Sequence, residues 1–313
     1  MERIDFSTGA PVPSNLDVVW IHGTRGRHKH AEPPLQVHQH DQHTYLIRQS
    51  KTVSYEAPFI YLLFGSDRAL LLDTGATADP GRFPLRRTVD QLIGQWLETH
   101  RRPRYELVVA HTHGHRDHVA ADGQFSDRPD TVVVGRAAAD ALAHFGINGN
   151  DPVGYDLGSR RLEVLATPGH HPAAVTIYDP WTGWLLTGDS VYPGRLYAFD
   201  YPRFLDSLDR ILRLAEERPV THVMGCHVEM TRTPGRDYPV GTTYQPDEAP
   251  LPMTVDQLRA VHRAAHEVAG RPGAHFFDDF AIFNGRCTGA ILRQLTRSAA
   301  HGVRAALTPS RSV

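Results

Sequence analysis

Three histidines and an aspartate fall within residues 113–118, directly after an apolar run at residues 107–110. Imidazole and carboxylate groups are ligands of zinc and neighbouring transition metals, and a tight loop after a strand lets near neighbours converge on one point. Burying such a group without a cation would cost on the order of several kcal/mol. The loop therefore predicts a metal site, and the fold of this chain has to bring further ligands to it. The candidate ligands in the loop are His113, His115, Asp117 and His118.

The composition is typical of a globular protein with a substantial core, because 41% of the 313 residues are hydrophobic. A formal net charge of -2 disfavours a surface for nucleic acid or anionic membranes, so the expected partner is a small-molecule substrate. The two cysteines, Cys226 and Cys287, cannot build a disulfide framework and favour a reducing compartment. No apolar run approaches the roughly 18 residues of a membrane span, and the N-terminal residues lack a signal core, so we expect a cytoplasmic protein.

Apolar runs of strand length alternate with helical patterns, which predicts an α/β chain. Strands are predicted at residues 59–64, 69–73, 107–110, 131–134, 162–166, 175–178, 184–187, 220–224 and 275–283. Helices are predicted at residues 89–97, 136–145, 204–215 and 258–268. Pro202 and Pro219 mark the two ends of the third helix.

Composition divides the chain into three predicted parts. Residues 1–55 are rich in Pro and His and are predicted to be an N-terminal arm packed on the core. Residues 56–300 are predicted to form one domain, and residues 301–313 a flexible tail. The Pro-rich stretch 233–252 predicts a long loop, which beside a site forms a lid or a substrate wall. If the chain forms a homodimer, the arm and this loop are the parts expected to mediate it.

Three later segments also place a polar side chain after an apolar run: Thr-Pro-Gly-His at 167–170, Thr-Gly-Asp at 187–189 and Gly-Cys-His at 225–227. Together with the His-x-His-x-Asp-His loop, and in this order, they resemble the metallo-β-lactamase superfamily. Asp73 matches an early aspartate of that family, and the resemblance spans about residues 58 to 231. It implies an α/β (α+β) fold, a four-layer αββα sandwich with the metal site at one edge between the two sheets.

The resemblance assigns a complete set of ligands to two metal positions. His113, His115 and His170 belong to the first position, Asp117, His118 and His227 to the second, and Asp189 bridges them. The cofactor implied is a pair of divalent ions, most often Zn²⁺, with Fe or Mn as alternatives.

Three further side chains lie close to these ligands in sequence. His111 and His171 fall outside the register of the family motif, so we expect them to support the ligands. Cys226 is expected to be a small buried residue, because Asp189 already fills the shared position.

The resemblance also implies a metal-dependent hydrolase, in which a metal-bridging hydroxide attacks an ester-like bond in a lactone, thioester, phosphoester or β-lactam. Asp117 is expected to orient the nucleophile or shuttle its proton. Tyr192 resembles a tyrosine that related lactonases place near the substrate oxygen, and its other interpretation is a packed aromatic ring. Tyr197 is a weaker candidate of the same kind.

Two other classes of function stay open from the sequence. Persulfide dioxygenases resemble this motif set but use a single iron, and a metal-binding protein without turnover would use its metal for folding alone. The His-rich arm contains His38 and His40, whose replacement by alanine is predicted to leave the metal content unchanged.

Overall fold

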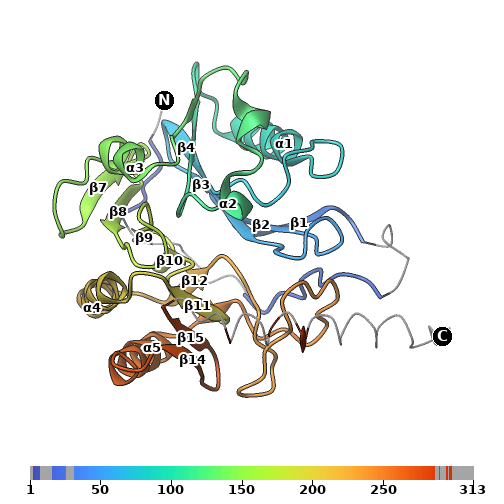
Figure 1. Cartoon of the computed structure of the whole chain (residues 1–313). Coiled ribbons are helices and arrows are strands. Elements are labelled where there is room, and N and C mark those ends of the chain that lie inside the picture. Colours follow the sequence, from blue (N-terminus) through green and yellow to red (C-terminus); the bar gives the residue numbers. More distant parts are fainter. Residues whose placement is uncertain are drawn as a thin grey trace.

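The computed structural model describes residues 3–7, 16–25 and 32–285, together with Gly289, Gln294, Thr296 and Arg297. Two six-stranded sheets carry the fold, and a three-stranded sheet lies beside them (Figure 1). The first sheet has the order β1-β2-β3-β4-β5-β6, comprising β1 (Leu35–Asp41), β2 (Thr44–Gln49), β3 (Phe59–Phe64), β4 (Arg68–Leu72), β5 (Glu106–Ala110) and β6 (Thr131–Val133). The second has the order β13-β12-β10-β9-β8-β7, comprising β7 (Val153–Asp156), β8 (Arg161–Ala166), β9 (Val175–Asp179), β10 (Trp184–Gly188), β12 (His222–Gly225) and β13 (Pro252–Met253). The third has the order β11-β15-β14, comprising β11 (Arg195–Ala198), β14 (Gly273–Phe276) and β15 (Ala281–Asn284).

Alternating side chains of the strands separate the structure into layers. On β3, Tyr61 and Leu63 point into a central core shared by the two large sheets, whereas Ile60 and Leu62 point into an outer core against α1 (Leu85–Thr99). A third core joins the outer face of the second sheet to α4 (Tyr201–Glu217) and α5 (Val255–Glu267). Three cores between four layers make the αββα sandwich that the sequence resemblance implied (Figure 1).

The helices begin and end where the sequence offers caps. Asp200 accepts a hydrogen bond from the backbone N–H of Arg203 at the start of α4, and Pro202 occupies its first turn. Thr254 and Gln257 form a reciprocal capping box at the start of α5. Residues 32–285 also form the helices α2 (Arg116–Val119), α3 (Ala138–Phe145) and the 3₁₀ helix η1 (Asp122–Phe125).

Most predicted elements are present, and the structure adds the short strands β7, β11 and β13, which were not predicted. Two other regions also differ from the prediction. The single strand predicted at 275–283 is a hairpin, because the chain turns between Phe277 and Phe280, whose backbone groups hydrogen bond over 2.9 Å. Strands β1 and β2 lie inside the segment predicted to be an arm, and they belong to the first sheet, where β1 pairs with β2 and β2 pairs with β3. The division into arm, domain and tail stays a prediction, and Cys287 and residues 301–313 lie outside the described residues. Among the described helices, none combines the length and the apolar character needed to cross a membrane.

Candidate metal centre

The predicted ligands meet at one edge of the sandwich because each follows the carboxyl end of a strand. The loop after β5 carries residues 113–118, and its last part forms the first turn of α2. His170 follows β8, Asp189 follows β10 and His227 follows β12. One sheet thus supplies four of the seven side chains and the other supplies three. The structure brings all seven together in two groups, His113, His115 and His170 in one, and Asp117, His118, Asp189 and His227 in the other.

In the first group, three imidazoles turn a nitrogen toward one point. His115 Nδ1 lies 2.9 Å from His113 Nε2 and 3.0 Å from His170 Nε2. Ligands bound to zinc at about 2.0–2.1 Å in a tetrahedron lie about 3.3 Å apart. The three nitrogens are therefore slightly closer together than such an ion would hold them.

In the second group, the spacing matches a tetrahedral ion directly. His118 Nε2 and His227 Nε2 are 3.3 Å apart. Asp117 Oδ2 lies 3.6 Å from His118 Nε2 and 3.4 Å from His227 Nε2. These distances lie close to the value of about 3.3 Å expected for donors that share one zinc-sized ion.

Asp189 faces both groups with different oxygens. Its Oδ1 lies 3.6 Å from Nε2 of both His118 and His227, whereas its Oδ2 lies 3.7 Å from His170 Nε2 and 3.9 Å from His113 Nε2. Oδ1 is buried and has no hydrogen-bond partner among the described residues. A buried carboxylate oxygen without a donor is costly, and a cation on each side of the carboxylate would remove that cost. The donor set therefore fits two metal ions that share Asp189.

The charges of the second group also favour a cation. Burial would raise the pKa of Asp117, but His227 and His118 lower it to about 2. Burial would lower the pKa of His227, but Asp189 and Asp117 raise it to about 9. The pKa of Asp189 is held well below its usual range by His227 and His118, against the effect of burial. The carboxylates therefore stay ionised, and their negative charge is costly when buried without a nearby positive charge. Either a metal ion or protonated imidazoles can supply that positive charge.

Three of the histidines are held in place through the ring nitrogen that faces away from the centre. His118 Nδ1 donates to Asp73 Oδ2 over 2.9 Å. His170 Nδ1 donates to the carbonyl of Tyr197 over 2.9 Å, and His227 Nδ1 donates to the carbonyl of Glu56 over 3.0 Å. Each bond fixes the tautomer that leaves Nε2 as a lone-pair donor. The sequence could not predict the two carbonyl acceptors, because every residue has a backbone carbonyl.

Asp73 organises the support behind the second group. It accepts the backbone N–H and the hydroxyl of Thr112 at 2.7 and 2.8 Å, and the Cys226 thiol at 3.2 Å. Burial and Asp73 raise the pKa of that thiol. Asp73, His118 and Cys226 also lie close enough to hold a metal, but the raised pKa of the thiol disfavours the thiolate that would bind it, and His118 presents its other ring nitrogen to the second group. This arrangement agrees with the expectation that Cys226 is a small buried residue.

Helix α4 fixes the loop that carries His170. Ser207 donates to the carbonyl of Pro168 over 2.6 Å, and Arg210 donates to the carbonyl of Ala166 over 2.7 Å. Gly169 has a φ of 142° and lies so close to α4 that an added Cβ would be 2.5 Å from the Cα of Phe204. Only glycine fits this contact, which explains its place in the Thr-Pro-Gly-His segment.

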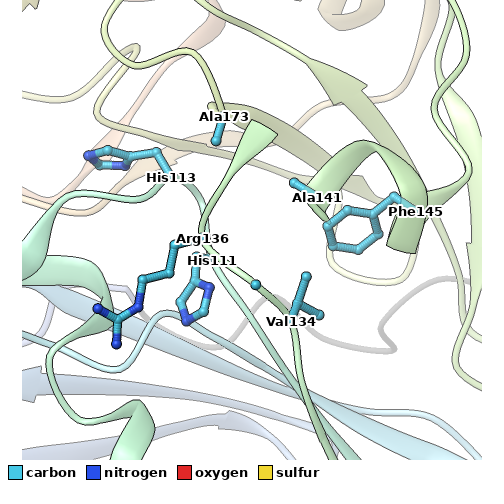
Figure 2. Close-up of a pocket in the computed structure, with 8 residues that line it drawn as sticks. His111, His113, Val134, Arg136, Ala141, Phe145 and Ala173 are labelled. Carbon is cyan, nitrogen blue, oxygen red and sulfur yellow. The ribbon is translucent and has the colours of Figure 1, made fainter. Parts of the chain in front are cut away.

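The two extra histidines take supporting positions. His111 Nε2 bonds to Asp122 over 2.9 Å, and Asp122 also contacts Arg136 and the hydroxyl of Thr74. Figure 2 shows the small pocket beside His111, with the His113 ring turned away from it. His171 Nδ1 accepts the backbone N–H of Ala173 over 3.1 Å.

The remaining candidates lie around the centre. The Tyr192 hydroxyl donates to the carbonyl of Arg195 and lies 3.2 Å from Glu229, and its ring centroid is 5.9 Å from that of His227. The Tyr197 hydroxyl accepts from Arg195 Nε over 3.1 Å. A catalytic role of either tyrosine stays a prediction.

A fold of two facing sheets with helices on both outer faces, holding histidines and aspartates at one edge, defines the class of metal-dependent hydrolases. The family model described as the metallo-beta-lactamase superfamily matches residues 56–227, and the chain belongs to this superfamily.

Two hydroxyacylglutathione hydrolases illustrate the curated relatives. That of Thermosynechococcus vestitus is 32% identical over 120 residues, covering 36% of this chain and 47% of the relative. That of Chelativorans sp. is 26% identical over 165 residues, covering 51% and 60%. The chain thus spans about half the length of these relatives.

Solved structures show the same fold. A metallo-β-lactamase from Erythrobacter litoralis has a TM-score of 0.52 at 13% identity, covering 75% of this chain and 98% of that one. The metallo-β-lactamase FIM-1 from Pseudomonas aeruginosa has a TM-score of 0.51 at 13% identity, covering 78% and 100%.

Proposed function

We propose that this chain is a binuclear metal-dependent hydrolase that cleaves an acyl thioester. The observation that carries the binuclear part is the position of Asp189, which presents one oxygen to each ligand group. The relatives named hydroxyacylglutathione hydrolases support a thioester rather than a lactone, phosphoester or β-lactam. Zn²⁺ is the ion that the nitrogen-rich donor set favours.

Two ions held by these residues would lower the pKa of a bound water toward neutrality and polarise the scissile carbonyl. The chain's own residues position these groups. Asp189 sets the spacing of the two groups, and Asp73 keeps His118 in the tautomer that faces them. Asp117 lies at the edge of the second group and is partly exposed, so it is placed to accept a proton from the attacking water and pass it to solvent.

A polar cavity of about 210 Å³ lies beside the centre and supports a hydrophilic substrate. Its walls include Glu56 and Tyr197, whose carbonyls hold His227 and His170. The cavity is also lined by Gln245, whose Oε1 is buried and has no hydrogen-bond partner among the described residues. A buried acceptor without a hydrogen-bond donor favours a ligand that donates a hydrogen bond, such as one with an amide or a hydroxyl group.

The paired charges of this cavity disfavour a strongly charged substrate. Lys51 lies 3.5 Å from Glu248, and Arg195 pairs with Glu229 and Asp237. We therefore infer that the thioester carries polar, hydrogen-bonding substituents instead of a long fatty acyl chain.

Elemental analysis of the purified protein tests the centre first. We expect two zinc-like ions in the wild type and about one in His118→Ala, with preferential hydrolysis of polar thioesters over lactones, phosphodiesters and β-lactams. A single iron that survives the His118→Ala substitution, with oxygen uptake on a persulfide, would overturn the proposal in favour of a dioxygenase. Bound metal without hydrolysis of any of these substrates would indicate a metal-binding protein without catalytic activity.

A further inference from the structure

A second group of metal-binding side chains lies on the surface, away from the buried centre. Asp209 of α4 faces His262 and His266 of α5. Oδ1 of Asp209 is 2.7 Å from Nε2 of His262 and 2.8 Å from Nε2 of His266. The three donor atoms lie within 4.8 Å of one another. We propose that this group is a third metal position, a site for a divalent transition ion that joins α4 to α5.

The helices place these donors without strain. His262 and His266 are four residues apart, so their side chains leave α5 on the same face, one turn apart. Their ring centroids lie 4.5 Å apart. Helices α4 and α5 lie beside each other (Figure 1). The apolar core beneath them, which includes Leu208 and Val261, packs the two helices together and fixes the backbones that carry the donors.

The chemistry of the donors selects the ion. Two imidazoles and a carboxylate suit Zn²⁺, Ni²⁺ or Cu²⁺, whereas Mg²⁺ and Ca²⁺ prefer oxygen donors. An ion with bonds of about 2.0–2.1 Å would hold each nitrogen about 3.3 Å from the carboxylate oxygen. The contacts of 2.7 and 2.8 Å therefore have to open by roughly half an ångström. The side chains of Asp209, His262 and His266 are 46%, 23% and 44% exposed, which leaves them room to move and lets water complete the coordination.

An ion at this position would act on the helix that supports the buried centre. Ser207 and Arg210, the neighbours of Asp209 in α4, hold the carbonyls of Pro168 and Ala166 in the loop before His170. Binding to the folded state alone stabilises it by mass action. The surface ion would therefore secure α4 against α5 and, through α4, the backbone that positions His170.

The test compares the wild type with His262→Gln/His266→Gln, using the full chain with its buried centre loaded with zinc. Zn²⁺ binding is measured by equilibrium dialysis, and thermal unfolding is followed as Ni²⁺ is added. The matched control is His144→Gln/His275→Gln, which replaces two histidines outside any group of three metal donors in the described part of the chain.

We expect the wild type and the control to bind one more zinc per chain than His262→Gln/His266→Gln, and only those two to gain thermal stability with Ni²⁺. Equal stoichiometry and equal thermal shifts in all three proteins would overturn the proposal and leave a hydrogen-bonded cluster. Asp209→Asn provides a second test should the double variant fold poorly, because it removes one ligand charge. It should weaken zinc binding at the surface site at least tenfold, while the buried centre keeps its zinc. Unchanged affinity in Asp209→Asn would likewise overturn the proposal.

Discussion

His118 donates from Nδ1 to Asp73 on the side of its ring opposite the nitrogen that faces Asp117 and Asp189. Asp73 is therefore placed to set the tautomer of one proposed ligand without touching the metal position itself. A carboxylate behind an imidazole also makes the facing nitrogen a stronger donor.

Replacing Asp73 by asparagine should weaken metal binding at the second position by about 10–100-fold, because the negative charge behind His118 is lost. Asparagine tolerates the φ of 72° at this residue, so the backbone is preserved. Chelator competition measures the affinity. Asp122→Asn is the control, since Asp122 supports His111 instead of a proposed ligand, and equal effects of the two substitutions would contradict the prediction.

The Tyr192 side chain should act mainly through packing. Its hydroxyl is occupied by the Arg195 carbonyl and Glu229, so Tyr192→Phe is expected to lower kcat by less than about tenfold. Tyr192→Ala should destabilise the fold by about 3–5 kcal/mol, as for other buried aromatic rings. Steady-state kinetics and denaturant unfolding measure the two effects. A hundredfold loss of kcat in Tyr192→Phe would instead support a catalytic hydroxyl.

Cys226→Ala should leave the metal content unchanged and lower the free energy of unfolding by about 1 kcal/mol, since one hydrogen bond to Asp73 is lost. The neighbouring substitution His227→Ala should remove about one metal ion per chain. Elemental analysis of both variants distinguishes a packed thiol from a ligand, and a lost ion in Cys226→Ala would show that the thiol binds metal.

Lys51 should make the stability of the fold depend on alkaline pH. Burial lowers its pKa to about 8, although Glu248 opposes the shift. Between pH 8 and its ordinary pKa of about 10.5, the unfolded chain binds a proton at Lys51 that the folded chain does not. The contribution of Lys51 to the free energy of unfolding is therefore smallest below pH 8. This contribution rises by about 3 kcal/mol as the pH approaches 10.5.

Comparison with Lys51→Met isolates this contribution from other groups that titrate in the same range. The free energy of unfolding, measured with denaturant at several pH values, should rise more steeply in the wild type than in the variant. Parallel curves for the two proteins would show that Lys51 keeps its ordinary pKa in the fold.

His38→Ala with His40→Ala should leave the metal content unchanged. His40 is buried with its ring centroid 4.2 Å from that of Trp184, and burial and the nearby His38 lower its pKa to about 4, so it serves as a neutral packing group. Loss of one metal equivalent per chain, measured by elemental analysis, would refute this prediction.

The sequence predicted the position of a residue best where a pattern among neighbouring residues was enough to place it. A polar side chain directly after an apolar run predicted where Asp189 and His227 lie, because strand ends of facing sheets share an edge. β1 was missed because the polar side chains at positions 36 and 38–40 leave too few apolar residues to show an alternation. The contact between Asp209 and the α5 histidines joins residues more than fifty positions apart in the sequence, so no local pattern reveals it.

A single carboxylate, that of Asp189, relates the two ligand groups to each other. It projects from the second sheet, whereas four of its companions come from one loop of the first. A sliding movement of one sheet over the other would therefore disturb both proposed metal positions at once. The geometry of the centre depends on the alignment of the whole sandwich, and binding of the proposed ion pair would select the one alignment in which both ions are fully coordinated.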